Sequence, residues 1–154
     1  MSDGGEPPAR RPRVSGAAKE AVRVRANHCC EYCKSRHDLA TQGFAAEHII
    51  PRDQGGANEL ENIALSCPGC NNHKFTKTSG TDSATQEFVR LFHPRRDSWN
   101  DHFEWSADKK RIVGRTAIGR ATVDTLQMNR ERLIRQRTVF IAAGEHPPTE
   151  PASQ

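Results

Sequence analysis

Short apolar runs separated by polar turns organise the N-terminal half of the chain. The runs GFAAEHII and IALS each have the length of a strand, and RDQGGANELEN between them has the Gly, Asn and Asp content of a loop. Helix formers precede the first run and follow the second. The predicted elements are a helix at 17–27, strands at 43–50 and 63–66 around a loop at 52–62, and a helix that begins near Cys70 and stops at 79–83.

The C-terminal half shows a second set of patterns. HFEWS at 102–106 and RIVGRT at 111–116 are predicted to form two strands joined by a turn at ADKK. One helix is predicted from 121 to 137, and its apolar stripe consists of Val123, Leu126, Leu133 and Ile134. Trp99 and Trp105 are expected in the core rather than as platforms for stacked bases.

Five arginines accompany this predicted helix: Arg120, Arg130, Arg132, Arg135 and Arg137. They are open to two interpretations. One is the solvated face of a helix that packs on the core. The other is a clamp on the phosphate backbone of a nucleic acid.

Composition changes this picture in three ways. Apolar residues are 34% of the 154 and charged residues 27%. The hydrophobic core is therefore small, and we expect a metal site or another cross-link to stabilise the fold. The formal net charge of +4 and the pI of about 9.0 favour anionic partners only mildly. No apolar run could span a bilayer, and the N-terminal residues lack the apolar region of a secretory signal. We therefore expect a cytoplasmic protein with reduced thiols.

The cysteines are candidates for this stabilising site. Cys30 and Cys33 form one Cys-x-x-Cys pair, and Cys67 and Cys70 form a second. Two such pairs in a reduced compartment predict four thiolates around one tetrahedral structural zinc. A disulfide pair fits poorly without a secretion signal, and two copies of a redox dithiol would be unusual. Cys29 is left as a spare or packed thiol, because the two-residue spacing to Cys33 favours Cys30.

The central segment resembles the HNH endonuclease family. The pieces that carry the resemblance are EYC, EHIIP, GG, LENIAL and CPGCNNHK, which follow the family's order and spacing between Cys30 and Lys74. The resemblance implies a ββα-metal active site in which a histidine takes a proton from water and a divalent cation, Mg²⁺ or Mn²⁺, acts on the phosphate. It covers under a third of the chain.

By this resemblance His48 is the general base, Glu47 and Asn71 hold the catalytic cation, and Asn62 holds the loop that orients the base. Gly55 and Gly56 permit a tight loop. Successive strand residues point to opposite faces, so a kink or bulge near Pro51 is expected to bring Glu47 and His48 to one site. Most members carry Asp at the position of Glu47, and the longer side chain moves the carboxylate by about one bond length.

The choice of Asn71 rather than His73 as the second ligand follows from helix geometry. His73 would complete the letters H-N-H, but at 100° per residue it lies roughly 200° round a helix from Asn71. Asn71, Lys74 and Thr78 are expected to share a face. Lys74 and Arg52 are candidate contacts with the phosphates of a substrate, and for Lys74 a solvated side chain is the alternative.

The sequence therefore predicts an α+β protein with a small zinc-stapled ββα core and a C-terminal strand-strand-helix extension. The predicted division is a disordered tail at 1–18, a nuclease core at 19–83, an extension packed on it at 84–144, and a disordered tail at 145–154. The predicted activity is metal-dependent hydrolysis of phosphodiester bonds in double-stranded DNA. A nucleic-acid-binding module without robust catalysis and a purely structural zinc domain are the alternatives.

Overall fold

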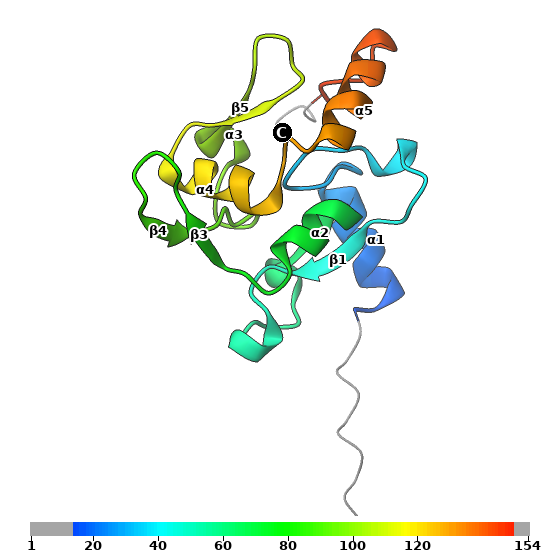
Figure 1. The fold of residues 1–154 in the computed structure, drawn as a ribbon. Helices are drawn as coiled ribbons and strands as arrows, with labels where there is room; N and C mark the ends of the chain where they lie inside the picture. Colours follow the sequence, from blue (N-terminus) through cyan, green and yellow to red (C-terminus); the bar gives the residue numbers. More distant parts are fainter. Residues whose placement is uncertain (1–13, 150–154) are drawn as a thin grey trace, which may run out of the picture.

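The computed structural model describes residues 14–149, and its short elements confirm the α+β class (Figure 1). The helices are α1 (Gly16–Arg25), α2 (Pro68–Lys74), α3 (Trp99–His102), α4 (Ala117–Leu126) and α5 (Glu131–Ala142). The strands pair as β1 (Ala45–His48) with β2 (Ile63–Ser66), β3 (Ser79–Thr81) with β4 (Phe88–Arg90), and β5 (Phe103–Trp105) with β6 (Ile112–Gly114). Short 3-10 turns lie at His37–Leu39, Arg52–Gln54 and Leu60–Asn62.

The strands β1 and β2 form a regular antiparallel hairpin. Glu47 lies opposite Ala64, and His48 lies opposite Ile63, with no extra residue between these pairs. The second strand has the predicted bounds, and the first is shorter than the expected 43–50. Because the register is unbroken, alternation places the side chains of Glu47 and His48 on opposite faces of the hairpin. The bulge expected to bring them to one face is absent from this pairing.

The two faces of this hairpin pack against different helices. On the face that carries His48, Ile63 and Leu65 form a small buried cluster with Val22 of α1. The face that carries Glu47 is turned toward α2, which lies across β1 in Figure 1. The hairpin is therefore covered on both sides, and the order strand, loop, strand, helix predicted from the sequence is present.

Helix α2 is set by the second cysteine pair. Cys67 is its N-cap, with Sγ accepting from the backbone N–H of Cys70 at 3.5 Å, and Pro68 takes a first-turn position that needs no N–H donor. The helix ends at Phe75, whose φ of 50° leaves the helical region. It is therefore shorter than expected, and Thr78 does not share a helical face with Asn71.

The hairpin β3–β4 was not predicted. Gly80 in its first strand lies so close to α4 that a Cβ atom there would be 2.3 Å from Oγ1 of Thr125. Asp82, the residue that follows β3, is fully buried. Its carboxylate accepts hydrogen bonds from Arg120 at 2.8 and 3.0 Å and from Thr85 at 2.7 Å. The Arg120 guanidinium holds the pKa of the Asp82 carboxyl well below its usual range. Contacts with α4 therefore stabilise a segment that looked like a helix stop.

The single helix expected at 121–137 is two helices. Thr116 caps α4 by accepting from the N–H of Gly119 at 3.0 Å, and Gln127 ends it in a left-handed conformation with φ of 51°. The next residue, Met128, is fully buried, so the break turns an apolar side chain into the core. The two strands expected before this helix are present as β5 and β6.

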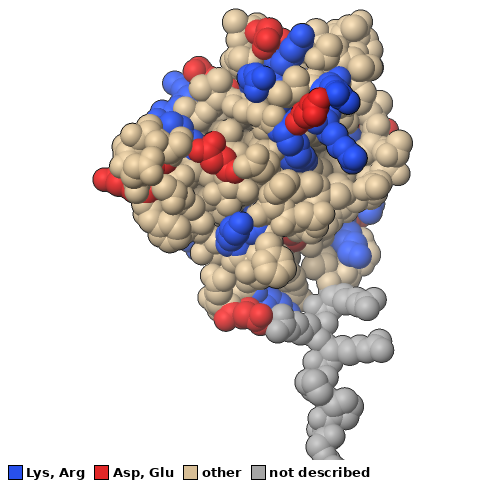
Figure 2. All heavy atoms as spheres, viewed as in Figure 1, with Lys and Arg blue, Asp and Glu red and all other residues tan. Residues whose placement is uncertain are grey.

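The break also changes the interpretation of the arginines. Arg120 is bound to Asp82, Arg130 contacts cysteine sulfurs, and Arg137 is buried and donates to the backbone carbonyl of Met128 at 2.7 Å. Only Arg132 and Arg135 remain exposed, and Arg135 pairs with Glu131 of its own helix at 2.5 Å. On the side of the molecule drawn in Figure 2, basic and acidic side chains are mixed. Three of the five arginines are thus held by contacts within the protein, so the five form no single solvated face, and the phosphate clamp stays a prediction.

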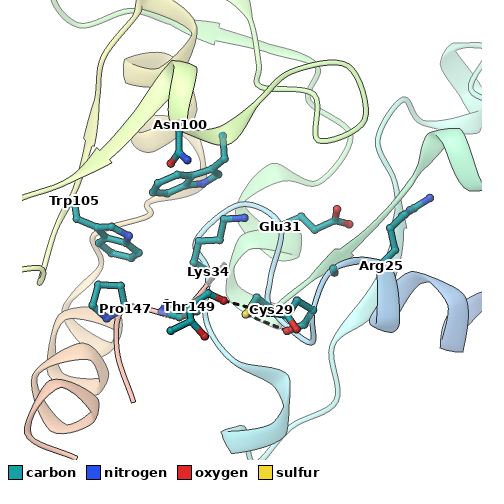
Figure 3. A pocket seen from close by; sticks show the side chains of 12 residues that line it. Arg25, Cys29, Glu31, Lys34, Asn100, Trp105, Pro147 and Thr149 are labelled. Atoms are coloured by element: carbon teal, nitrogen blue, oxygen red, sulfur yellow. Dashed lines mark hydrogen bonds between the residues drawn. The ribbon is translucent and has the colours of Figure 1, made fainter. Parts of the chain in front are cut away.

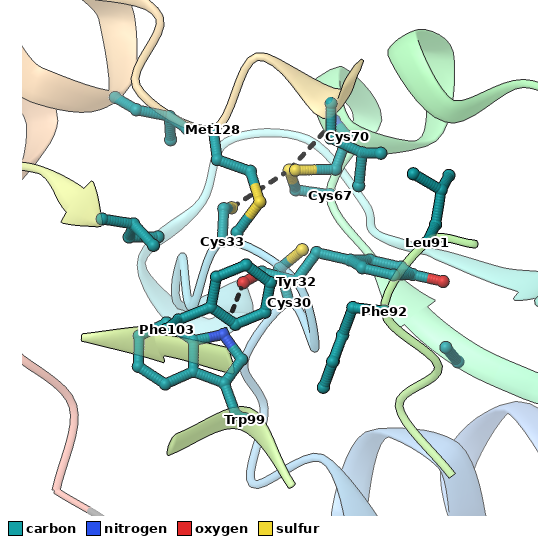
Figure 4. Close-up of a cluster of buried hydrophobic side chains, with 14 of the residues drawn as sticks. Cys30, Tyr32, Cys33, Cys67, Cys70, Leu91, Phe92, Trp99, Phe103 and Met128 are labelled. Atoms are coloured by element: carbon teal, nitrogen blue, oxygen red, sulfur yellow. Dashed lines mark hydrogen bonds between the residues drawn. The ribbon is translucent and has the colours of Figure 1, made fainter. Parts of the chain in front are cut away.

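The main core joins the two halves of the chain. Figure 4 shows Trp99 and Phe103 of the extension beside the cysteines and Tyr32. The indole Nε1 of Trp99 donates to the carbonyl of Tyr32 at 2.8 Å, and Trp99 is 9% exposed, as expected for a core residue. Trp105 is half-buried and packs on Trp99 with ring centroids 5.7 Å apart. The extension is therefore packed on the region of the cysteines.

The predicted tails lie mostly outside the described residues, because 1–13 and 150–154 are not part of them. The remainder of each tail differs from the expectation. Helix α1 begins at Gly16, after Ser15 accepts from the N–H of Ala18 at 3.1 Å as an N-cap. Near the other end, His146 packs edge-on against Trp105 with centroids 4.6 Å apart. Both short stretches therefore make local contacts, and the predicted division of the chain stays a prediction.

Candidate functional site

The four cysteines of the two Cys-x-x-Cys pairs meet in one buried cluster. Their sulfur atoms all lie within 4.8 Å of one another. Sγ of Cys33 and Sγ of Cys67 are 3.6 Å apart, close to the edge of about 3.8 Å expected for a tetrahedron with metal–sulfur bonds of about 2.3 Å. Figure 4 shows the sulfurs turned toward one another. The predicted four-cysteine metal-binding cluster is therefore present, and its donor set fits one tetrahedral metal ion.

Cys29 does not take part in this cluster. Its thiol donates to the backbone carbonyl of Asn27 at 3.4 Å, and its residue is 5% exposed. Burial raises the pKa of the Cys29 thiol, which disfavours the thiolate that a metal would need. The expectation that Cys29 is a packed thiol agrees with this position.

Arg130 lies against the outside of the cysteine cluster. Its guanidinium is 3.3 Å from Sγ of Cys67 and 3.7 Å from Sγ of Cys70. A Cβ atom on Gly69, between these cysteines, would be 2.3 Å from the same guanidinium. Burial alone would lower the pKa of Arg130, but the cysteine sulfurs raise it. Nothing in the sequence indicated this contact, because Arg130 follows the cysteines by sixty residues.

His48 is the last residue of β1 and its side chain is half-buried. Its Nε2 is 2.9 Å from Oδ1 of Asn58, in the loop between the two strands. An amide oxygen only accepts hydrogen bonds, so this contact selects the tautomer with the proton on Nε2 and leaves the lone pair on Nδ1. Asn58 was not singled out in the sequence, where it was one polar loop residue among several.

Asn62 holds the loop that follows His48. Its Oδ1 accepts from the N–H of Ile50 at 2.9 Å, and its Nδ2 donates to the carbonyls of Ile50 and Ala57 at 2.9 and 2.8 Å. Gly56 is needed beside it, because a Cβ atom there would be 1.8 Å from the carbonyl oxygen of Ile50. Gly55 has φ of 88°, which favours glycine. These contacts are those expected of a residue that fixes the loop.

Glu47 is buried on the opposite side of the strand. The hydroxyl of Tyr32 donates to its Oε1 at 2.5 Å, and its Oε2 is 3.5 Å from Nζ of Lys74. Burial raises the pKa of Glu47, while Lys74 and Tyr32 oppose that effect. Tyr32 belongs to the EYC piece of the motif, but its role as a donor to Glu47 was not foreseen.

Lys74 is 1% exposed and donates to the carbonyl of Ile49 at 2.9 Å. It is therefore not available to a substrate phosphate, contrary to the prediction. Arg52 is half-buried in the turn Arg52–Gln54, and its Nη1 is buried without a hydrogen-bond partner among the described residues. Its expected phosphate contact stays a prediction.

On α2, Asn71 is half-buried and His73 is exposed. Residues three apart share a helical face, so Asn71 lies on the side of α2 from which Lys74 reaches Glu47. The two predicted cation ligands thus lie toward the same side of the hairpin. His48 lies on the other face, so the structure does not bring all three predicted residues together on one face.

The fold and these sites define a small α+β protein with a four-cysteine metal centre. The family model described as HNH endonuclease matches residues 30–77, which confirms the resemblance over this segment of the chain. Neither the curated proteins nor the solved structures contain a match to the chain. Within residues 14–149 no helix has the length and apolar character needed to cross a membrane.

Proposed function

We propose that the protein is an endonuclease that hydrolyses phosphodiester bonds in double-stranded DNA, with His48 as the general base. The observation that carries the proposal is His48 itself, presented at the end of β1 by a loop that Asn62 and Gly56 fix. The family match to residues 30–77 supports a nuclease-type function. Nicking of supercoiled plasmid in the presence of Mg²⁺ or Mn²⁺ tests the proposal.

In this proposal Oδ1 of Asn58 accepts a hydrogen bond from the N–H at Nε2 of His48, and Nδ1 takes the proton from the attacking water. An imidazole suits this step because its ordinary pKa lies near neutrality. Asn62 acts through the backbone of the loop and does not touch the reacting atoms. Holding the loop limits the positions that the imidazole can adopt, and a positioned base is more effective than a mobile one.

The catalytic cation is proposed to lie between β1 and α2, held by Glu47 and Asn71. Carboxylate and amide oxygens are the donors that Mg²⁺ prefers, and both residues lie toward this side of the hairpin. A divalent cation bound there would stabilise negative charge on the phosphate and on the leaving 3′ oxygen. Lys74 now supplies the positive charge beside Glu47, so a cation would have to share or replace this contact.

We expect Asn71→Ala to lower cleavage and to require more Mg²⁺ or Mn²⁺ for half-maximal activity. His73→Ala is the matched control on the same helix, and we expect it to change activity less than about threefold, because His73 is exposed on another face. The measurement is plasmid nicking over a range of cation concentrations. Loss of cleavage in His73→Ala with full cleavage in Asn71→Ala would show that the motif is aligned wrongly.

A second candidate function is a nucleic-acid-binding module with weak or no catalysis. Two observations favour it: Glu47 is already paired with Lys74, and His48 lies on the other face of the hairpin. In that case plasmid would bind without being cut at any tested concentration of Mg²⁺ or Mn²⁺. This alternative gives no role to His48 or to the loop that Asn62 fixes, so we place it second.

The metal in the cysteine cluster is proposed to be a structural zinc. Four thiolates around Zn²⁺ carry a net charge of −2, and the Arg130 guanidinium beside two of the sulfurs offsets part of it. Thiols that stay free for such a cluster are typical of a reducing compartment, so the proposed location is the cytoplasm.

Removing the guanidinium of Arg130 should weaken zinc binding. We expect Arg130→Ala to lower the zinc affinity roughly 10- to 100-fold, the usual effect of removing a group that contacts metal ligands. Arg132→Ala removes an exposed arginine of the same segment and should leave the affinity unchanged. The measurement is competition with a chromophoric chelator, which needs no nuclease activity. Equal affinities in the two variants would contradict a role for Arg130 at the metal centre.

A further inference from the structure

A separate cavity lies between the end of α1, the turn around Glu31 and Lys34, α3, β5 and the C-terminal residues of the described chain. Its volume is about 320 Å³, within the range of roughly 300–1,000 Å³ typical of small-ligand sites. Trp99, Trp105 and Pro147 form apolar walls, and Lys34 and Glu31 supply polar groups. Figure 3 shows Lys34 between Trp105 and Glu31. None of the residues proposed for phosphodiester hydrolysis lines it.

Lys34 is a charged group that this cavity leaves available, whereas Arg25, which also lines it, donates to the backbone carbonyls of Leu60 and Ile63 at 2.9 and 2.5 Å. Its ammonium lies 5.4 Å from the centroid of the Trp99 ring, and within residues 14–149 it forms no ion pair with a carboxylate. The neighbouring carboxylate of Glu31 is paired instead with Arg95 and accepts from the N–H of Leu65 at 2.8 Å. The negative charge at the edge of the cavity is thus already neutralised, while the positive charge of Lys34 is not.

The backbone at Lys34 adds a second observation. Its φ is 65°, in the left-handed region that favours glycine and asparagine over lysine. The backbone N–H of Lys34 donates to the carbonyl of Cys30 at 3.0 Å, and within the described chain its ammonium contacts the Trp99 ring without forming a hydrogen bond or ion pair. Its side chain instead reaches into the cavity. A residue with positive φ that places its charge beside an aromatic ring in a cavity is a feature of many binding sites.

We propose that this cavity binds a nucleoside monophosphate, with the base against the tryptophan and proline walls and the phosphate on Lys34. Aromatic side chains accept any base through its π-face, and an ammonium is a natural partner for phosphate. The choice of a nucleotide over other aromatic anions rests on the proposed function. A free mononucleotide and a 5′-phosphorylated strand end both carry such a base and phosphate.

Tryptophan fluorescence reports directly on this cavity, because the chain has only two tryptophans and both line it. Full-length, zinc-loaded protein is titrated with 2′-deoxyadenosine 5′-monophosphate, without Mg²⁺ or Mn²⁺. We expect saturable quenching, with deoxyadenosine binding at least tenfold more weakly because it lacks the phosphate. Inorganic phosphate alone should compete with the nucleotide but cause little quenching.

The decisive variant is Lys34→Asn, which removes the ammonium and places a residue that tolerates positive φ in the strained turn. It should fold as well as the wild type and bind the nucleotide at least tenfold more weakly. Lys77→Asn, at an exposed lysine that does not line this cavity, is the matched control and should bind normally. No saturable quenching at millimolar nucleotide, or equal binding by Lys34→Asn and wild type, would overturn the proposal.

Two further comparisons distinguish the two sources of the ligand from each other, and this proposal from the proposed function. A short single-stranded oligonucleotide with a 5′ phosphate that binds more tightly than its 5′-hydroxyl form would identify a strand end. Equal, weak binding of both would identify the free mononucleotide. Plasmid cleavage without nucleotide binding would reject this cavity alone. Nucleotide binding without cleavage would reject the endonuclease alone.

Discussion

Cys67→Ser is expected to unfold the described part of the chain. A structural site of four thiolates contributes on the order of 10 kcal/mol of metal-binding free energy, and a typical domain is stable by only about 5–15 kcal/mol. Cys67 is also the N-cap of α2 and its sulfur contacts Arg130. The aromatic core of the extension packs on the same cluster, so both halves should lose structure together.

The measurement is far-UV circular dichroism and urea unfolding, with metal analysis of the purified protein. Cys29→Ser is the matched control, since its thiol is buried outside the cluster with one weak hydrogen bond. It should retain one zinc per chain and lose about 1 kcal/mol of stability. A well-folded wild type without bound metal would contradict the prediction, and so would a folded 84–144 segment in Cys67→Ser.

His48→Ala is expected to lower the rate of plasmid cleavage by about 10²- to 10⁴-fold, the usual contribution of a positioned general base. The reason is that Nδ1 of His48 is the proposed acceptor of the proton from water. His48 neither belongs to the cysteine cluster nor packs in the core, so zinc content and thermal stability should be unchanged.

The control for this prediction is binding rather than cleavage. DNA affinity, measured by fluorescence anisotropy with a labelled duplex, should be nearly the same for His48→Ala and wild type, because one half-buried imidazole does not dominate phosphate contacts. The cleavage products should carry 5′ phosphate and 3′ hydroxyl ends. Full activity of His48→Ala would show that another residue, or contaminating nuclease, is responsible for cleavage.

The cysteine centre and the central elements could be predicted because their signals are local. Two Cys-x-x-Cys pairs allow few arrangements other than one shared metal, and the cluster has the expected members. The strand Ile63–Ser66 has the predicted bounds because it is a short apolar run between turn residues. The glycines and Asn62 act within one loop, where neighbouring sequence determines which hydrogen bonds can form.

The relative placement of the predicted site residues could not be predicted from local sequence signals. Glu47 and His48 are adjacent, and whether they share a site depends on whether β1 is bulged, which the pairing with β2 decides. Lys74 looked like a surface lysine, but its ammonium is held by a backbone carbonyl and by Glu47. A buried charge needs such partners, and sequence spacing does not identify them.

By itself the sequence determined the class of the protein: a four-cysteine metal centre, a strand-loop-strand-helix core and the HNH resemblance. The tertiary structure alone decided how the extension divides into α4 and α5, that Arg130 reaches the cysteine sulfurs, and that Lys34 lies over Trp99 in a cavity. These contacts join residues sixty or more positions apart. Their energies come from burial and charge pairing across the packed core, so they exist only once the chain has folded.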